Sequence, residues 1–255
     1  MEPIISGIQQ LGVGIPHVHE AWAWYSKHFG MQVKIFDDAG TAAQMLPYTG
    51  GKPRERHAIL AINMQGGGGF EIWQYKSRKP QPAGFQIQAG DLGIYAGKIK
   101  TRDARKTYDN FKAQGLDLVS GPQPGPNGMQ HFYVRDPYNN IFDVVEAKSW
   151  FSENKNLTGG SFGAVMGVSD IDRALPFYAE ILGYDEVVYD KTGTFDDMQH
   201  LPGGTAKFRR VLLRHSKARK GAFSRILGPS EMELLAVQDR QPKKIFENRL
   251  WGDLG

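Results

Sequence analysis

The chain of 255 residues contains no cysteine, and this absence excludes whole classes of chemistry. Without thiols it can form neither disulfides nor thiolate metal sites, and it has no cysteine nucleophile. It also lacks an uncharged apolar run long enough to span a bilayer. Its first residues, MEPIISGIQQLG, have neither the basic start nor the apolar centre of a signal peptide. We therefore expect a cytoplasmic protein without a membrane partner.

Two familiar binding motifs are missing as well. The sequence has no phosphate-binding GxxxxGK[ST] motif and no zinc-binding His-Glu-x-x-His motif. The glycine run at 66–69 is not followed by a helix pattern, so we interpret it as a hairpin turn or a mobile lid. Residues 207–228 are strongly basic, but their only aromatic residues are Phe208 and Phe223. Stacking on nucleic acid needs more aromatic side chains, so we predict a solvated hairpin and no nucleic-acid partner.

The composition favours a globular protein with many turns. Glycine is abundant at 31 residues, proline stands at 14, and hydrophobic residues make up 40% of the chain. Many short strands fit this composition better than long helices. The net charge of +4 is a mild excess, which favours an anionic substrate and by itself says little about nucleic acid.

Three segments of the chain share one pattern. Residues 21–33, 104–119 and 172–188 each read as an amphipathic helix that ends at a glycine and is followed by a β-branched run. Strand-like stretches precede each helix, at 8–15, 92–99 and 162–168, and further strand candidates follow. The pattern therefore predicts three βαβββ units, each of which needs a neighbour to bury its hydrophobic face.

A repeated tetrapeptide suggests how the units are grouped. Gly90-Asp91-Leu92-Gly93 opens the second unit, and the same four residues, 252–255, stand where a fourth unit would begin. We predict an α+β fold in which βαβββ modules pair into cupped mixed sheets. The first domain is 1–150, a linker follows at 151–159, and 160–255 forms a second, incomplete domain.

The helix ends WYSKHFGM and FYAEILGY, together with the strand pair VRDPYNNIFDVVE, resemble the vicinal oxygen chelate superfamily. This superfamily includes glyoxalases, bleomycin-resistance proteins and extradiol dioxygenases. The resemblance implies a glyoxalase-like fold in which a divalent metal is held by the first and last strands of paired modules. It fixes the fold better than the reaction, because one scaffold hosts many activities.

The resemblance assigns candidate ligand positions in each unit. They fall on Gln10 and Glu71 in the first unit, on Ala96 and Asp143 in the second, and on Gly163 and Glu233 in the third. It thus implies Gln10, Glu71 and Asp143 as metal ligands, with Glu71 the first candidate for a catalytic base. On strand alternation alone, Glu71 and Asp143 face a site or solvent equally well.

An all-oxygen ligand set suits Mg²⁺ or Mn²⁺ better than a tight zinc site, although Ni, Fe and Zn stay open. No histidine stands at a first-strand ligand position, and His57 and His131 are the two histidines placed to reach a pocket.

These features leave three functional hypotheses. The first is a divalent-metal-dependent lyase, isomerase or dioxygenase that acts on a small oxygen-rich substrate. The second is a non-catalytic small-molecule-binding protein of the bleomycin-resistance kind, with a pocket lined by Trp22, Trp24, Trp73 and Tyr75. The third is a scaffold whose function lies in oligomer contacts. Because an unpaired third unit would expose a sheet face and edge, we also predict a homodimer.

Overall fold

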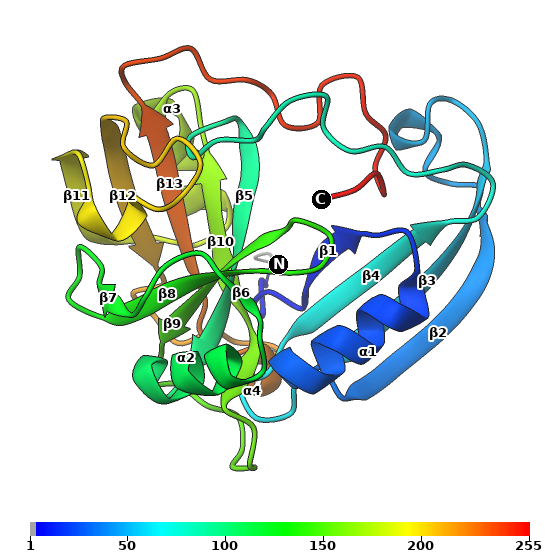
Figure 1. Cartoon of the computed structure of the whole chain (residues 1–255), viewed down its shortest axis with the longest axis horizontal. Helices are drawn as coiled ribbons and strands as arrows, with labels where there is room; N and C mark the ends of the chain where they lie inside the picture. The colour runs from blue at the N-terminus through cyan, green and yellow to red at the C-terminus, as the bar shows by residue number, and fades with distance from the viewer. Residues whose placement is uncertain (1–3) are drawn as a thin grey trace.

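A computed structural model describes residues 4–255 and shows three successive units, each with a first strand, a helix and further strands (Figure 1). The elements of the first unit are β1 (Gln10–Gly14), α1 (Val18–Phe29), β2 (Val33–Ala42), the 3₁₀ turn η1 (Leu46–Tyr48), β3 (Arg54–Ile62) and β4 (Gly69–Tyr75).

The second and third units repeat this order with local changes. The elements of the second unit are β5 (Gly93–Thr101), α2 (Ala104–Ala113), β6 (Asp117–Leu118), β7 (Gln123–Pro124), β8 (Gln130–Arg135) and β9 (Ile141–Glu146). The elements of the third unit are β10 (Thr158–Gly167), α3 (Ile171–Pro176), the π-helical turn η2 (Phe177–Ile181), β11 (Glu186–Gly193), the 3₁₀ turn η3 (Asp196–Met198), β12 (Phe208–Arg214), α4 (Ser224–Leu227) and β13 (Glu231–Val237).

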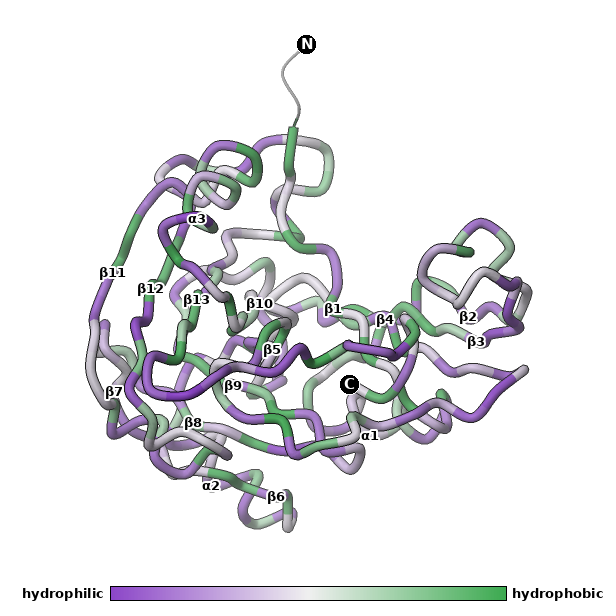
Figure 2. The backbone as a smooth tube through the Cα atoms, turned by 90° about the horizontal axis from the view of Figure 1, so that it is seen from above, coloured by the Kyte–Doolittle hydropathy of each residue, from purple (hydrophilic) through white to green (hydrophobic). Residues whose placement is uncertain are grey.

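The strands form two sheets. The first unit makes a four-stranded sheet in the order β1-β4-β3-β2, so β1 lies at its edge. The second and third units share one nine-stranded sheet, because β5 and β10 pair antiparallel at its centre. Figure 2 shows the two sheets from above, with β11 to β13 at one side of the molecule and β2 and β3 at the other. The second unit is therefore hydrogen-bonded to the third, rather than to the first unit with which the sequence analysis grouped it.

Hydrophobic packing nevertheless joins the first unit to the second. One core cluster combines α1 and the inner residues of β3 and β4 with residues of α2, β8 and β9. Helix α1 contributes Val18, Ala21, Tyr25 and Phe29, which recur at the three- and four-residue spacing of one helix face. The helix ends at Gly30, whose φ of 67° is the left-handed conformation that the sequence predicted for a capping glycine. No helix within residues 4–255 is long and apolar enough to cross a membrane.

The glycine run before β4 is packed rather than mobile. A Cβ atom on Gly66 would collide with the backbone of Gly159 and Gly160, and one on Gly67 would collide with the carbonyl of Ile226. The turn is thus enclosed between β10 and α4, and glycine is required there because two backbones meet without space for a side chain. The structure favours the hairpin-turn interpretation of this segment over a lid.

The two copies of the repeated tetrapeptide are held by matching carboxylate cradles. In the first copy, Asp91 accepts hydrogen bonds from Gln88 N at 2.8 Å, Lys243 N at 2.9 Å and Arg240 Nη1 at 2.7 Å. The next residue, Leu92, donates its N–H to the carbonyl of Lys243 at 2.7 Å. These contacts fix the start of β5 beside β10.

The second copy repeats every one of these contacts with the equivalent residues. Asp253 accepts hydrogen bonds from Leu250 N and Gln81 N, both at 2.8 Å, and from Arg78. Leu254 donates its N–H to the carbonyl of Gln81 at 3.1 Å. The C-terminal segment therefore docks on the first unit as the start of β5 docks on the third.

Both docked segments lie against a glycine of a first strand. A Cβ on Gly14 would collide with the carbonyl of Asp253, and a Cβ on Gly167 would collide with the carbonyl of Asp91. Gly14 and Gly255 exchange two backbone hydrogen bonds, of 2.8 and 3.2 Å, as in an antiparallel pair. Figure 1 shows the C-terminus beside β1 accordingly.

Candidate functional site

Gln10 and Glu71 form a polar pair on two adjacent strands of the first unit. Because β1 and β4 run parallel with Gly12 opposite Glu71, both side chains are directed to the same face of the sheet. Gln10 Nε2 donates a hydrogen bond of 2.7 Å to Glu71 Oε2, and both residues are half-buried. We call this pair the Gln10–Glu71 site.

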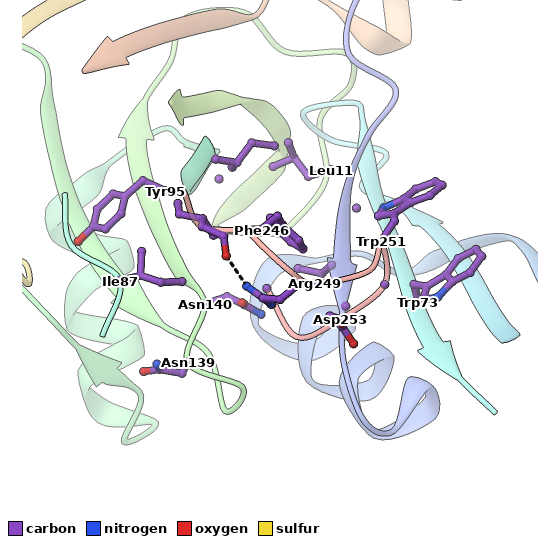
Figure 3. A pocket seen from close by; sticks show the side chains of 18 of the residues that line it. Leu11, Trp73, Ile87, Tyr95, Asn139, Asn140, Phe246, Arg249, Trp251 and Asp253 are labelled. Carbon is purple, nitrogen blue, oxygen red and sulfur yellow. Dashed lines mark hydrogen bonds between the residues drawn. The ribbon is translucent and has the colours of Figure 1, made fainter. Parts of the chain in front are cut away.

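The Gln10–Glu71 site opens into a large cavity of about 770 Å³. The cavity is walled by β1 and β4 on one side, by β5 and the β8–β9 turn on the other, and by the C-terminal segment 245–255. Figure 3 shows Trp73 and Trp251 together at the first-unit wall, and Tyr95 and Ile87 at the opposite wall. A cavity of this size with mostly apolar walls and a few polar groups is typical of a small-molecule site.

The C-terminal segment supplies two further groups to this cavity. Trp251 stacks on Trp73 with ring centroids 5.4 Å apart and an interplanar angle of 18°. Arg249 donates to the carbonyls of Ile245 and Leu254. Within residues 4–255, no carboxylate lies within 4.0 Å of this guanidinium, and its burial lowers its pKa from the usual value. The cavity therefore carries a cation that no ion pair neutralises.

Of the four aromatic residues expected in the pocket, Trp73 lines the cavity and the other three do not. Trp22 and Trp24 pack against the hydrophobic core around α1. Their position follows from the helix, because each is adjacent in sequence to a buried residue of its inner face, Ala21 or Tyr25.

Asp143, the third ligand expected from the sequence, is not brought to the Gln10–Glu71 site. It lines a separate small cavity between the second and third units, which shares no lining residue with the large one. Charged side chains from both units surround it there. We call this group the buried charged cluster, and its members are Lys98, His131, Asp143, Asp197, Arg210, Arg214, Glu231 and Glu233.

The ion pairs of this cluster shift the pKa values of Lys98 and Glu233. Burial alone would lower the pKa of Lys98, but the carboxylates of Glu231, Glu233 and Asp143 raise it well above its usual value. Burial would raise the pKa of Glu233, yet Arg210 and Lys98 together hold it far below its usual value. Lys98 and Glu233 are thus ionised and stabilise each other away from water.

His131 lies between two carboxylates of the cluster, Asp143 of the second unit and Asp197 of the third. Its Nδ1 lies 2.7 Å from Asp143 Oδ1, and its Nε2 lies 3.3 Å from Asp197 Oδ2, outside hydrogen-bond geometry. Burial acts to lower its pKa, but the two carboxylates prevail and raise it to about 9. The sequence placed His131 near a pocket, and the structure gives it a partner in an ion-pair network.

His57, the other histidine singled out in the sequence, lies away from both cavities. Its Nε2 lies 2.5 Å from Asp37 Oδ1 near the start of α1, where the ring of His19 contacts it edge-on. Hydrogen bonds from Lys34 and His57 lower the pKa of Asp37 to about 2. Lys34, Asp37 and His57 thus satisfy one another's hydrogen bonds at the surface.

The sequence analysis overlooked Lys98, Arg210 and Glu231. A usable signal existed: Lys98 stands two residues after the ligand position Ala96, so strand alternation places it on the same face. Glu231 and Glu233 likewise share one face of an apolar strand, and Arg210 interrupts another. Charges of opposite sign within apolar strands indicate buried ion pairs.

The family profile described as "Glyoxalase/Bleomycin resistance protein/Dioxygenase superfamily" matches residues 7–144. A lactoylglutathione lyase of Arabidopsis thaliana is 29% identical over 103 residues, which are 39% of this chain and 34% of that protein. The chain thus aligns with about a third of the length of this curated relative.

Two solved structures illustrate the likeness of fold. A putative dioxygenase from Bacillus subtilis has a TM-score of 0.56 at 12% identity, covering 96% of this chain and 70% of that one. Glyoxalase I from Zea mays has a TM-score of 0.51 at 12% identity, covering 92% of this chain and 69% of that one. At this identity the structures establish the fold and not the activity. The profile match spans more than half of the chain and agrees with the βαβββ units, and the chain therefore belongs to the glyoxalase/bleomycin resistance protein/dioxygenase superfamily.

Proposed function

We propose that this chain works as a divalent-metal-dependent lyase, isomerase or dioxygenase of small oxygen-rich substrates. The proposal is carried by the contact between Gln10 and Glu71, two oxygen-bearing side chains on adjacent strands at an open cavity. Within residues 4–255, Gln10 Oε1 and Glu71 Oε1 accept no hydrogen bond, so both atoms are free to contact a cation. Amide and carboxylate oxygens are ligands of hard ions such as Mg²⁺ and Mn²⁺.

The residues around the site suit this chemistry. When bound, a divalent ion would supply a Lewis acid toward two adjacent oxygens of a substrate. Glu71 would hold the ion and accept a proton from the substrate, because it lines the cavity and its Oε1 accepts no hydrogen bond from the described residues. Arg249 favours an anionic substrate, and the apolar walls exclude water from it. Asp143 is left out of the proposed site because His131 and Lys98 already occupy its carboxylate.

The test is a metal titration of the wild type and the Glu71→Gln variant. We expect about one Mn²⁺ per chain in the wild type and at least tenfold weaker binding in the variant, since one charged ligand is lost. Glu55→Gln is the matched control, because Glu55 is an exposed carboxylate of the adjacent strand β3. Unchanged binding in Glu71→Gln would refute the proposed site.

The first reaction to assay is formation of lactoylglutathione, because the Arabidopsis relative is a lactoylglutathione lyase. Ring cleavage by oxygen is the second, in view of the putative dioxygenase of similar fold from Bacillus subtilis. Turnover that depends on both Mn²⁺ and Glu71 would support the enzyme.

One observation favours a second function, binding of an aromatic molecule without turnover. The stacked rings of Trp73 and Trp251 offer a flat apolar surface, and Trp251 is 41% exposed. Stabilisation by an aromatic ligand in the absence of metal would support this function.

We also propose a homodimer and a cytoplasmic location. The edge strand β1 and the exposed apolar residues Tyr48, Ile94 and Phe246 near the cavity support an association between chains. Sedimentation at micromolar concentration should show the dimer, and a single monomeric species would contradict it.

A further inference from the structure

The last strand of each unit carries a carboxylate at the same register. These residues are Glu71, Asp143 and Glu233, and each is directly opposite the residue that stands six positions before the helix of its unit. The opposite residues are Gly12 in the first unit, Lys98 in the second and Val165 in the third. The three carboxylates are therefore structurally equivalent, but their surroundings differ.

In the shared sheet, the side chain of Lys98 lies among three carboxylates. Its Nζ is 2.9 Å from Glu231 Oε1, 2.9 Å from Glu233 Oε2 and 3.7 Å from Asp143 Oδ2. All four side chains are at most 4% exposed. An ammonium group has three donors and no acceptor. Lys98 therefore occupies the centre of the three carboxylates, where a metal ion would otherwise bind.

The other oxygens of these carboxylates are also engaged. Glu233 Oε1 accepts hydrogen bonds from Arg210 Nε at 2.7 Å and from Tyr189 OH at 2.8 Å. Glu231 Oε2 accepts two from Arg214, at 2.8 and 3.1 Å. The cavity left between these side chains measures about 20 Å³, which is space for about one water molecule.

We propose that the Lys98 ammonium replaces a divalent metal ion in the site between the second and third units. In the native protein this site therefore binds neither a metal nor a substrate. It is a latent metal site, which opens when the Lys98 side chain is removed. The family resemblance implies a metal between paired modules, but the residues between the second and third units do not fit one while Lys98 is present. This conclusion is independent of the Gln10–Glu71 site.

Physical chemistry favours this exchange of cations. A divalent ion among the three carboxylates would be in contact with the Lys98 ammonium, and the two positive charges repel each other. The ion can therefore bind only if the ammonium is displaced. Truncation of Lys98 leaves three buried carboxylates with fewer counter-charges, and uncompensated buried charge is strongly destabilising. Carboxylate oxygens in the space freed by the side chain are suitable ligands for Mn²⁺.

The experiment is a Mn²⁺ titration followed by electron paramagnetic resonance and calorimetry, with every variant in a Glu71→Gln background. We expect the parent Glu71→Gln chain to bind no Mn²⁺ in the charged cluster and Lys98→Ala to bind about one per chain. Adding Glu233→Gln to Lys98→Ala should abolish this binding. Lys100→Ala is the matched control, because Lys100 is a buried lysine of the same strand that contacts the carbonyls of Gly66 and Ser149 instead of carboxylates. It should bind none.

A second variant keeps the test valid if Lys98→Ala fails to fold. Lys98→Ala combined with Glu231→Gln removes one negative charge along with the positive one, and it should melt at a higher temperature with Mn²⁺ than without. A folded chain of either kind that binds no Mn²⁺ at millimolar concentration would overturn the proposal. So would Mn²⁺ bound to the Lys98-containing parent and released by Glu233→Gln. Because all chains lack Glu71, these outcomes do not depend on whether the first unit binds a metal.

Discussion

The Gln10–Glu71 site and the buried charged cluster are built on the same backbone frame and have opposite properties. Glu71 and Glu233 occupy equivalent registers of parallel strand pairs. Glu71 is half-buried at a cavity of about 770 Å³, whereas Glu233 is fully engaged beside a cavity of about 20 Å³. The comparison teaches that the frame presents a carboxylate and that the residues facing it decide whether it binds a ligand or supports the fold.

The largest expected effect is on stability, from the loss of Arg210 in the cluster. Its guanidinium pairs with Asp197 and Glu233 and is 2% exposed, so Arg210→Met should lower the free energy of unfolding by about 3–5 kcal/mol. The matched control is Arg209→Met, because Arg209 pairs with Asp172 and Asp190 at the surface and should cost less than about 1 kcal/mol. Urea unfolding measures both, and equal losses would mean that the cluster is not the stabilising element.

The cluster should also make stability depend on pH. The pKa of His131 is raised to about 9, above its unfolded value. Its contribution, about 3 kcal/mol, is therefore complete below about pH 6.5 and is lost as the pH rises through 9. The pKa of Lys100, lowered by burial to about 8, acts in the opposite sense. The measurement is thus the difference between wild type and His131→Gln in urea unfolding from pH 6 to 10, and a difference that does not change with pH would contradict the prediction.

The two carboxylate cradles allow a sharper comparison of the same regions. Asp91 holds a strand inside the continuous sheet, so Asp91→Ala should lower global stability by about 2 kcal/mol. Asp253 holds a segment at an edge, so Asp253→Ala should chiefly release that segment, with about half this effect on global unfolding. Hydrogen exchange at residues 250–255 checks this, and protection that survives in Asp253→Ala would argue against the cradle.

The last expected effect is on metal affinity rather than on stability, and it comes from a transfer of the ammonium group to the first unit. Gly12 is the equivalent of Lys98, and a Cβ atom there would meet nothing within 4 Å. Gly12→Lys should therefore fold normally and weaken Mn²⁺ binding at Glu71 about tenfold, which corresponds to about 1.4 kcal/mol. Gly12→Ala, which adds no charge, is the control and should bind as the wild type does.

Much of the fold follows from local sequence patterns, and its assembly does not. The helix ends at Gly30, Gly115 and Gly183 were predicted correctly, because each glycine adopts a left-handed φ of 67–74° that side chains disfavour. The partner of β5 could not be predicted, because the three first-strand stretches of the sequence, 8–15, 92–99 and 162–168, are similar in length and pattern. Pairing of β5 with β10 rather than β1 depends on how complete units approach each other, and strand periodicity carries no information on that.

The candidate ligands were assigned from the family resemblance. The structure places Gln10 and Glu71 in contact, and their role as metal ligands stays a prediction. Asp143 was assigned in the same way, but its surroundings are set by Lys98 and by residues of the third unit. Which carboxylate stays open is a property of the contacts between units.

The identical cradles around Asp91 and Asp253 also bear on how the protein folds. Each cradle recognises the sequence Gly-Asp-Leu-Gly through the same set of backbone and arginine donors. A folding chain therefore has two equivalent segments, 90–93 and 252–255, for two equivalent cradles, and one of the two ways to pair them is wrong. We expect such a choice to slow folding, because a wrongly inserted segment must be released again before the chain can reach its native pairing. Internal duplication, which supplied the fold with its units, thus also supplied it with a competitor for its own assembly.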